Sequence, residues 1–96
     1  MRVLVCYDVA NGDRAGQRRL RKIAEACRDH GMRVQLSLFE CQLSDTQWLL
    51  LRTRLLDLYK ADQDSLRFYF LSEDCVRRTE HHGVRTPVEV TDPLVI

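Results

Sequence analysis

The residues of this chain best suited to chemistry are one carboxylate, Asp8, and the basic side chains that follow it. Asp8 ends a predicted strand at 2–8, and the chain then carries Arg14, Arg18, Arg19, Arg21 and Lys22. A carboxylate held at the end of a strand can bind a divalent cation, and a set of guanidinium groups can bind phosphates. Position alone, however, favours a simpler interpretation in which Asp8 begins a turn.

The net charge of +1 conceals an uneven distribution of charge along the chain. Residues 1–34 carry eight Lys/Arg and four Asp/Glu, a balance of +4. Residues 35–96 carry seven Lys/Arg and ten Asp/Glu, a balance of −3. The basic N-terminal part therefore offers a place where nucleic acid can bind, although basic residues on a helix are more often simply solvated.

The length of the chain, 96 residues, predicts one domain that spans residues 1–96. Because so short a chain buries a modest share of its surface, an interface with a second copy would help to stabilise it. No apolar run approaches the roughly 20 residues needed to cross a bilayer, and Arg2 opens a strand rather than a signal peptide. We therefore expect a cytoplasmic protein that makes no membrane contact.

The four cysteines are widely spaced and form no C-x-x-C pair. In a chain without a secretory signal they are expected to stay reduced. Cys6 and Cys27 are expected to be small core residues. A zinc site built from cysteines with His81 and His82 is disfavoured because the ligands lack paired spacing.

The hydrophobic pattern predicts the strands that must position these residues. Residues 2–8 are apolar on both faces, which is typical of a central strand covered on two sides. Residues 33–43 alternate but are too long for one strand, so we expect two short strands that meet at a bend near Ser37 and Leu38. The aromatic residues 65–71 predict another strand, and residues 84–90, which contain Pro87, predict a last strand at an edge.

Two long helices complete the pattern. The first covers residues 14–30, capped by Asp13 and ended by Gly31. The second opens with a capping box at residues 44–47 and buries Trp48, Leu51, Leu55 and Leu58.

This second helix also carries Leu49, Leu50 and Leu56, and we expect a deep core to cover them, with another chain as the alternative. A short turn or helix follows at 72–78. The order predicts an α+β, ferredoxin-like βαββαβ fold, an antiparallel sheet covered by two helices, with an extra C-terminal strand.

Several segments together resemble a known family. They are Tyr7-Asp8, residues 16–22 and residues 31–41, and residues 65–71 and 92–96 extend the likeness to essentially the whole chain. The chain resembles the second, smaller universal CRISPR-associated protein of the adaptation module, particularly members from type I-C systems. The block Arg33-Val34-Gln35-Leu36-Ser37-Leu38-Phe39-Glu40-Cys41, after a glycine, is the specific part, although Leu38 stands where the family more often has valine.

The resemblance implies a homodimer in which residues 84–96 of each chain pack on the partner. It implies a metal-dependent endonuclease that hydrolyses RNA or DNA. In such an enzyme Asp8 is the catalytic residue and the Mg²⁺ ligand, with Mn²⁺ as an alternative, and it faces its symmetry mate. The substrate contacts implied by the family are Tyr7, Arg18, Arg19, Arg33 and Phe39.

Two other functions are alternatives to a nuclease. The resemblance also implies a non-catalytic scaffold in spacer acquisition, which bridges subunits of the larger CRISPR integrase and binds duplex DNA through the basic first helix without a metal. An unrelated ferredoxin-like RNA-binding module is disfavoured, because the aromatic strand Phe68-Tyr69-Phe70 lacks the glycine context of an RNA-recognition motif.

Overall fold

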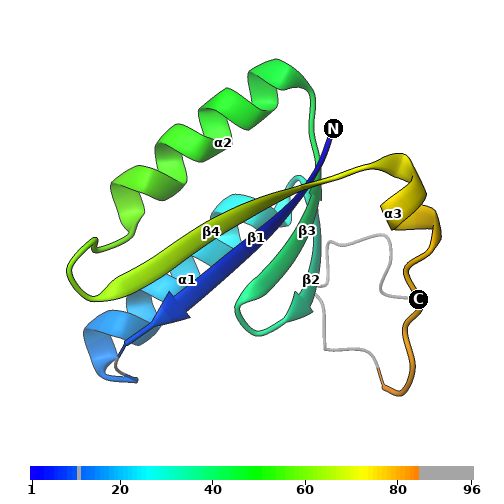
Figure 1. Ribbon diagram of the computed structural model, residues 1–96. Coiled ribbons are helices and arrows are strands. Elements are labelled where there is room, and N and C mark those ends of the chain that lie inside the picture. The colour runs from blue at the N-terminus through cyan, green and yellow to red at the C-terminus, as the bar shows by residue number, and fades with distance from the viewer. Residues whose placement is uncertain (11, 85–96) are drawn as a thin grey trace.

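The computed structural model describes residues 1–10 and 12–84, and its elements follow the predicted order (Figure 1). The strands are β1 (Arg2–Val9), β2 (Gly31–Gln35), β3 (Leu38–Gln42) and β4 (Asp64–Leu71). The helices are α1 (Arg14–Arg28), α2 (Asp45–Leu58) and the short α3 (Glu73–Arg77). The strands form one antiparallel sheet in the order β2-β3-β1-β4, which confirms the ferredoxin-like α+β fold. Val84 lies in no strand, and the rest of the predicted last strand falls outside the described residues.

The two long helices begin at the predicted caps. The Asp13 carboxylate accepts a hydrogen bond from the Gly16 amide at 2.7 Å. At the start of α2, the Ser44 hydroxyl accepts from the Gln47 amide at 3.2 Å, and the Gln47 side chain accepts from the Ser44 amide at 2.9 Å. Each cap satisfies amides that the first helical turn leaves without a partner, so these local residues set where the helices start.

The role of Gly31 differs from the prediction. Helix α1 ends at Arg28 with Asp29 as its cap, and Gly31 is already the first residue of β2. A Cβ atom at Gly31 would lie 1.9 Å from the Glu40 carbonyl oxygen and 2.7 Å from the Cys41 Cα atom. The prediction that Gly31 ends the helix was wrong, because the glycine is needed where β2 passes close to β3.

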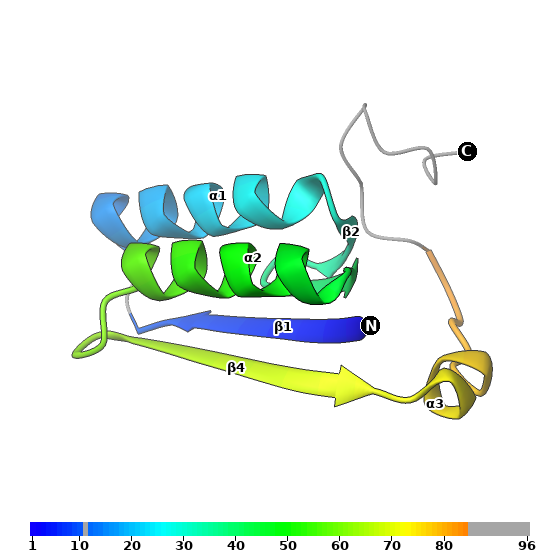
Figure 2. The same ribbon diagram turned by 90° about the horizontal axis from the view of Figure 1, so that it is seen from above.

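Both long helices pack on the same face of the sheet (Figure 2). The core between them and the sheet contains Val3, Val5, Tyr7, Ile23, Ala24, Ala26, Cys27, Phe39, Cys41, Leu43, Trp48, Leu51 and Leu55. On the opposite face of β1, Leu4 and Cys6 are half-buried and Asp8 is exposed. The prediction that β1 is covered on two sides is therefore wrong within the described chain, and Cys6 is not a core residue.

The additional leucines of α2 are not covered by a deep core. Leu49, Leu50 and Leu56 are 62%, 69% and 37% exposed, because Trp48, Leu51 and Leu55 already complete the buried stripe of the helix. The prediction that a deep core covers these three leucines is therefore wrong. No helix in the described ranges is long and apolar enough to cross a membrane.

We predict that Gly31→Ala lowers the free energy of unfolding by about 3 kcal/mol, because a backbone carbonyl cannot move away from the new methyl group. Urea unfolding followed by the fluorescence of Trp48, the single tryptophan, measures this change. Gly12→Ala is the matched control, since the nearest atom to its added Cβ is Gln17 Nε2 at 3.8 Å. Equal stability of the two variants would show that β2 and β3 can separate without cost.

Candidate active site

Tyr7 and Asp8 are adjacent in β1 and point to opposite faces of the sheet. Tyr7 is 2% exposed and belongs to the core beneath the helices. Asp8 is exposed on the face that the two long helices leave uncovered, and it pairs across the strands with Ser65 of β4. Successive side chains of a strand alternate in this way, so only Asp8 of the two can meet a ligand on the uncovered face.

Asp8 lies in an open hollow of about 400 Å³ on this face. The hollow is lined by residues of β1, β2, β3, β4 and the β2–β3 turn, which are Cys6, Tyr7, Asp8, Gln35, Ser37, Leu38, Ser65, Arg67 and Tyr69. Asp8 and Arg67 are the acidic and basic residues among them. Burial raises the pKa of the Cys6 thiol, although Arg67 opposes that change, so Cys6 is a neutral thiol near neutral pH.

The described residues contain no group of three His, Cys, Asp or Glu side chains arranged to hold a metal ion. Asp8 nevertheless suits magnesium as a single oxygen ligand, because magnesium is usually bound through one or two carboxylates, with waters and substrate phosphates completing its coordination. A site built on Asp8 therefore needs oxygen ligands from outside one chain.

On the helix side of β1, Tyr7 and Arg19 meet at Asp64, the first residue of β4. The Tyr7 hydroxyl donates to Asp64 Oδ2 at 2.5 Å. Arg19 donates to both carboxylate oxygens, from Nε at 2.8 Å and from Nη2 at 3.0 Å, and the Lys60 amide donates to Oδ2 at 3.0 Å. The Asp64 side chain is 0% exposed and that of Arg19 is 15% exposed. This Asp64 network ties β1, α1 and β4 together directly behind the strand end that carries Asp8.

The network changes the acidity of its members. Burial raises the pKa of Tyr7 to about 12, and the hydrogen bond to Asp64 adds to the effect. Burial acts to raise the pKa of Asp64 as well. The hydrogen bonds from Arg19, Tyr7 and the Lys60 amide outweigh it, and the pKa of Asp64 falls below its ordinary value. Asp64 is thus a buried carboxylate whose charge is matched by its donors.

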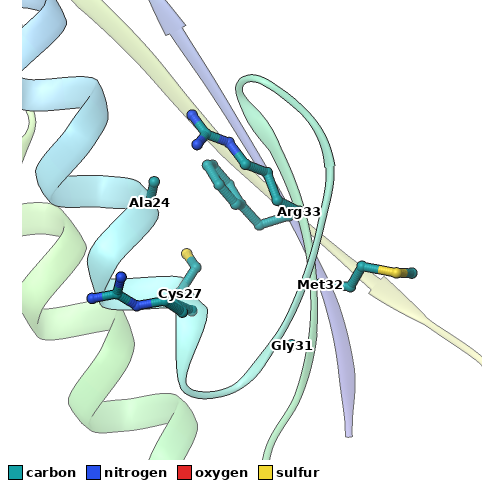
Figure 3. Close-up of a pocket in the computed structure, with 7 residues that line it drawn as sticks. Ala24, Cys27, Gly31, Met32 and Arg33 are labelled. Atoms are coloured by element: carbon teal, nitrogen blue, oxygen red, sulfur yellow. The ribbon is translucent and has the colours of Figure 1, made fainter. Parts of the chain in front are cut away.

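Arg33 and Phe39 are brought together, but away from Asp8. Figure 3 shows Arg33 extending from β2 toward α1, while Met32 points to the other side of the strand. The Arg33 Nε and Nη2 atoms donate to the Leu36 carbonyl at 2.9 and 2.6 Å, and the guanidinium carbon lies 5.4 Å from the centroid of the Phe39 ring. Phe39 is 2% exposed, so its ring is part of the core.

The remaining predicted contact, Arg18, is exposed on α1. Arg14, Arg21 and Lys22 are exposed on the same helix, and none of the four forms an ion pair with another residue in the described ranges. Because α1 covers one face of the sheet and Asp8 projects from the other, these cations do not surround Asp8 within one chain. Asp8 and these basic residues are close together in the sequence, but in the fold the sheet lies between them.

Two residues of these clusters were missed by sequence reasoning. Arg67 could have been found, because Ser65, Arg67 and Tyr69 alternate with apolar residues and so share the exposed face of β4. Asp64 carries no such signal, since it stands at the polar start of the strand and its partners are distant in the chain.

The chain is similar to one family model, to several relatives in sequence and to solved structures. The family model described as CRISPR associated protein Cas2 matches residues 1–79. A CRISPR-associated endoribonuclease Cas2 of Chlorobaculum tepidum is 46% identical over 96 residues, covering all of both chains. A CRISPR-associated endonuclease Cas2 of Halalkalibacterium halodurans is 41% identical over 99% of each chain. The crystal structure of Streptococcus pyogenes Cas2 at pH 6.5 has 42% identity and a TM-score of 0.80, and the match covers 86% of this chain and 100% of that one.

We predict that Asp64→Asn removes about 3 kcal/mol of stability near neutral pH, because it leaves Arg19 without its buried anion. Since the folded pKa of Asp64 lies below its ordinary value of 3.8, its contribution is present above that value and is lost as the pH falls through the folded pKa. The stability difference between wild type and variant, measured by urea unfolding, should therefore shrink in acid. Ultraviolet titration should also show a pKa for Tyr7 below the wild-type value of about 12, because the Asp64 charge no longer opposes ionisation of the hydroxyl, while burial still does.

Asp62→Asn, which alters an exposed carboxylate in the preceding turn, is the matched control and should change neither quantity. A stability difference that stays constant into acid would contradict the charge of Asp64, and an unshifted tyrosine titration would contradict its bond to Tyr7.

Proposed function

The chain belongs to the CRISPR associated protein Cas2 family, and from this premise we propose that it is a cytoplasmic, metal-dependent endonuclease of CRISPR adaptation that works as a homodimer. The proposed reaction is hydrolysis of a phosphodiester bond of RNA or DNA, with water as the nucleophile. The names of the relatives, endoribonuclease and endonuclease, support this class of reaction. Membership of the type I-C group remains a prediction.

The observation that carries this proposal is the position of Asp8. It is an exposed carboxylate at the end of a strand in the middle of the sheet, in a hollow on the face that the helices do not cover. A single carboxylate leaves most coordination positions of a divalent cation to be filled by other oxygen ligands. Pairing of two chains about a twofold axis on this face would bring a second Asp8 opposite the first.

The uncovered face also has the character of a surface that a second copy could bury. Half-buried apolar side chains lie on it between the charged residues, namely Leu4, Met32, Leu38 and Leu71. Burial of such apolar groups would contribute to association. The predicted packing of residues 84–96 on the partner concerns residues outside those described, and it remains part of the proposal.

The residues of the chain have separate tasks in this proposal. Asp8 holds the cation, and the Asp64 network behind β1 holds the strand end in place. The chemistry that a bound Mg²⁺ or Mn²⁺ ion supplies at such a position is a water of lowered pKa and positive charge beside the phosphodiester.

We predict that Asp8→Ala abolishes Mg²⁺-dependent cleavage of RNA or duplex DNA while sedimentation still reports a dimer. The loss follows because the alanine offers no oxygen to the cation. Asp57→Ala, at an exposed carboxylate of α2, is the matched control and should cleave like wild type. Equal cleavage by wild type and Asp8→Ala would refute the catalytic role and point to a contaminating nuclease.

We also propose a second role, as a DNA-binding scaffold for the larger CRISPR integrase, which is compatible with the first. Its support is the exposed basic face of α1. Arg21 and Arg33 also line an open groove of about 320 Å³ between α1 and the β2–β3 turn. Such cations would bind the phosphates of a duplex without reading its sequence.

For this second role we predict that Arg18→Ala makes duplex DNA binding less dependent on salt. The slope of log K against log salt concentration should become shallower by about 0.9 for each phosphate that Arg18 neutralises. Arg77→Ala is the matched control, since Arg77 lies near Glu73 and Asp74 on α3 and its charge is already partnered. Arg19 is unsuitable for this test, because its removal would break the Asp64 network. An unchanged slope for Arg18→Ala would exclude this residue as a phosphate contact.

A further inference from the structure

We propose that Arg67 holds a substrate phosphate beside Asp8, and that Tyr69 fixes the direction of the Arg67 guanidinium. The inference rests on the proposed nuclease function, because it assigns a phosphate-binding residue to the hollow that contains Asp8. The ligand class is a phosphodiester of a nucleic acid backbone.

The register between β1 and β4 places Arg67 next to Asp8. Asp8 pairs with Ser65, and Cys6 pairs with Arg67, in two neighbouring antiparallel strands (Figure 1). Asp8 and Arg67 are therefore diagonal neighbours on one face, at a backbone separation of about 7–8 Å, which a long side chain can span. Both side chains line the same hollow.

The charges of the hollow fit a phosphate only if Arg67 takes part. Asp8 alone would repel an anionic backbone, and the basic residues of α1 lie on the far side of the sheet (Figure 2). Arg67 is the basic residue among those that line the hollow. A guanidinium group can donate two parallel hydrogen bonds to a phosphate, which also fixes the orientation of that phosphate.

The Arg67 side chain is oriented by Tyr69, and it keeps hydrogen-bond donors for a ligand. Its Nη1 atom donates to the Tyr69 hydroxyl at 2.9 Å, and its guanidinium carbon lies 5.7 Å from the centroid of the Tyr69 ring. A guanidinium has five N–H donors. Within the described ranges Arg67 makes one hydrogen bond, to the Tyr69 hydroxyl, so its other donors can bind a ligand. An arginine already fixed in this way loses less conformational entropy when it binds a phosphate.

Two of the three arginines predicted as substrate contacts already direct their donors to groups of the chain itself. Arg19 directs two donors to Asp64, and Arg33 directs two donors to the Leu36 carbonyl. A phosphate would have to displace those bonds to engage the same donors, whereas Arg67 offers free donors on the face of Asp8. This difference favours Arg67 over Arg19 and Arg33 as the phosphate contact near the scissile bond. Arg18 is set apart by position instead, because it lies on α1, across the sheet from Asp8.

Three variants test the inference, namely Arg67→Ala, Arg67→Lys and Tyr69→Phe. The matched control is Arg52→Ala, at an exposed position of α2. We expect Arg67→Ala to lower kcat/KM about thirtyfold, the loss typical of a hydrogen bond to a charged group. Arg67→Lys should recover part of that loss. Tyr69→Phe should lower kcat/KM by about threefold, and this effect should disappear in the Arg67→Ala background, because Tyr69 acts through Arg67.

A binding readout separates this inference from the proposed function. In the Asp8→Ala background, Arg67→Ala should weaken binding of a single-stranded RNA or duplex DNA probe and should leave the sedimentation of the dimer unchanged. Unchanged kcat/KM and unchanged affinity in Arg67→Ala would overturn the inference while leaving a nuclease that depends on Asp8 intact.

A shift of the Arg67→Ala variant from dimer to monomer would also overturn the inference, since Arg67 would then be an interface residue. If wild type cleaves no probe, the proposed function fails, and the affinity of Arg67→Ala for the probe still decides the role of Arg67.

Discussion

The Asp64 carboxylate is fully buried, so its charge has to be met by donors within the fold. Four hydrogen bonds meet it, from the Tyr7 hydroxyl, two Arg19 nitrogens and the Lys60 amide. These donors come from β1, α1 and the turn before β4, which are separate parts of the chain. Removing one partner would leave an uncompensated charge in the interior, so the network fixes how these elements meet as well as stabilising them.

This constraint explains how the candidate active site is built. Tyr7 is held in the core, and the next residue, Asp8, therefore projects to the uncovered face. The carboxylate proposed to hold a cation stands on a strand that is anchored from behind, while its own oxygens accept no hydrogen bond from the other described residues. A site supported from the opposite face of a sheet can stay open to a ligand without losing its position.

Two residues predicted as substrate contacts, Tyr7 and Arg19, are parts of this buried network instead of exposed groups. Their place in the family pattern is compatible with an indirect role, in which they hold the strand end and do not touch nucleic acid. Arg33 and Phe39 form a second pair of this kind, with the guanidinium covering the buried ring. The exposed cations of α1 and Arg67 of β4 are better placed to meet phosphates, and they lie on opposite faces of the sheet.

The features that the sequence predicted well depend on residues that are close together in the chain. The Asp13 cap, the capping box at Ser44 and the alternation in β4 are local, because a cap or a strand face involves only a few neighbouring positions. The order of the elements followed from these signals. Gly31 was misinterpreted because the constraint on it comes from Glu40 and Cys41 of the next strand, whose approach no local pattern reveals.

The sequence by itself determined that Asp8 lies near the carboxyl end of an apolar strand and that a basic helix follows it. Only the tertiary structure decided which cations share a face with Asp8. Side-chain direction in a sheet depends on strand register and on the face that the helices cover. Here, that register brings Arg67 to Asp8, while the packing of α1 turns the nearby arginines of the sequence to the other side.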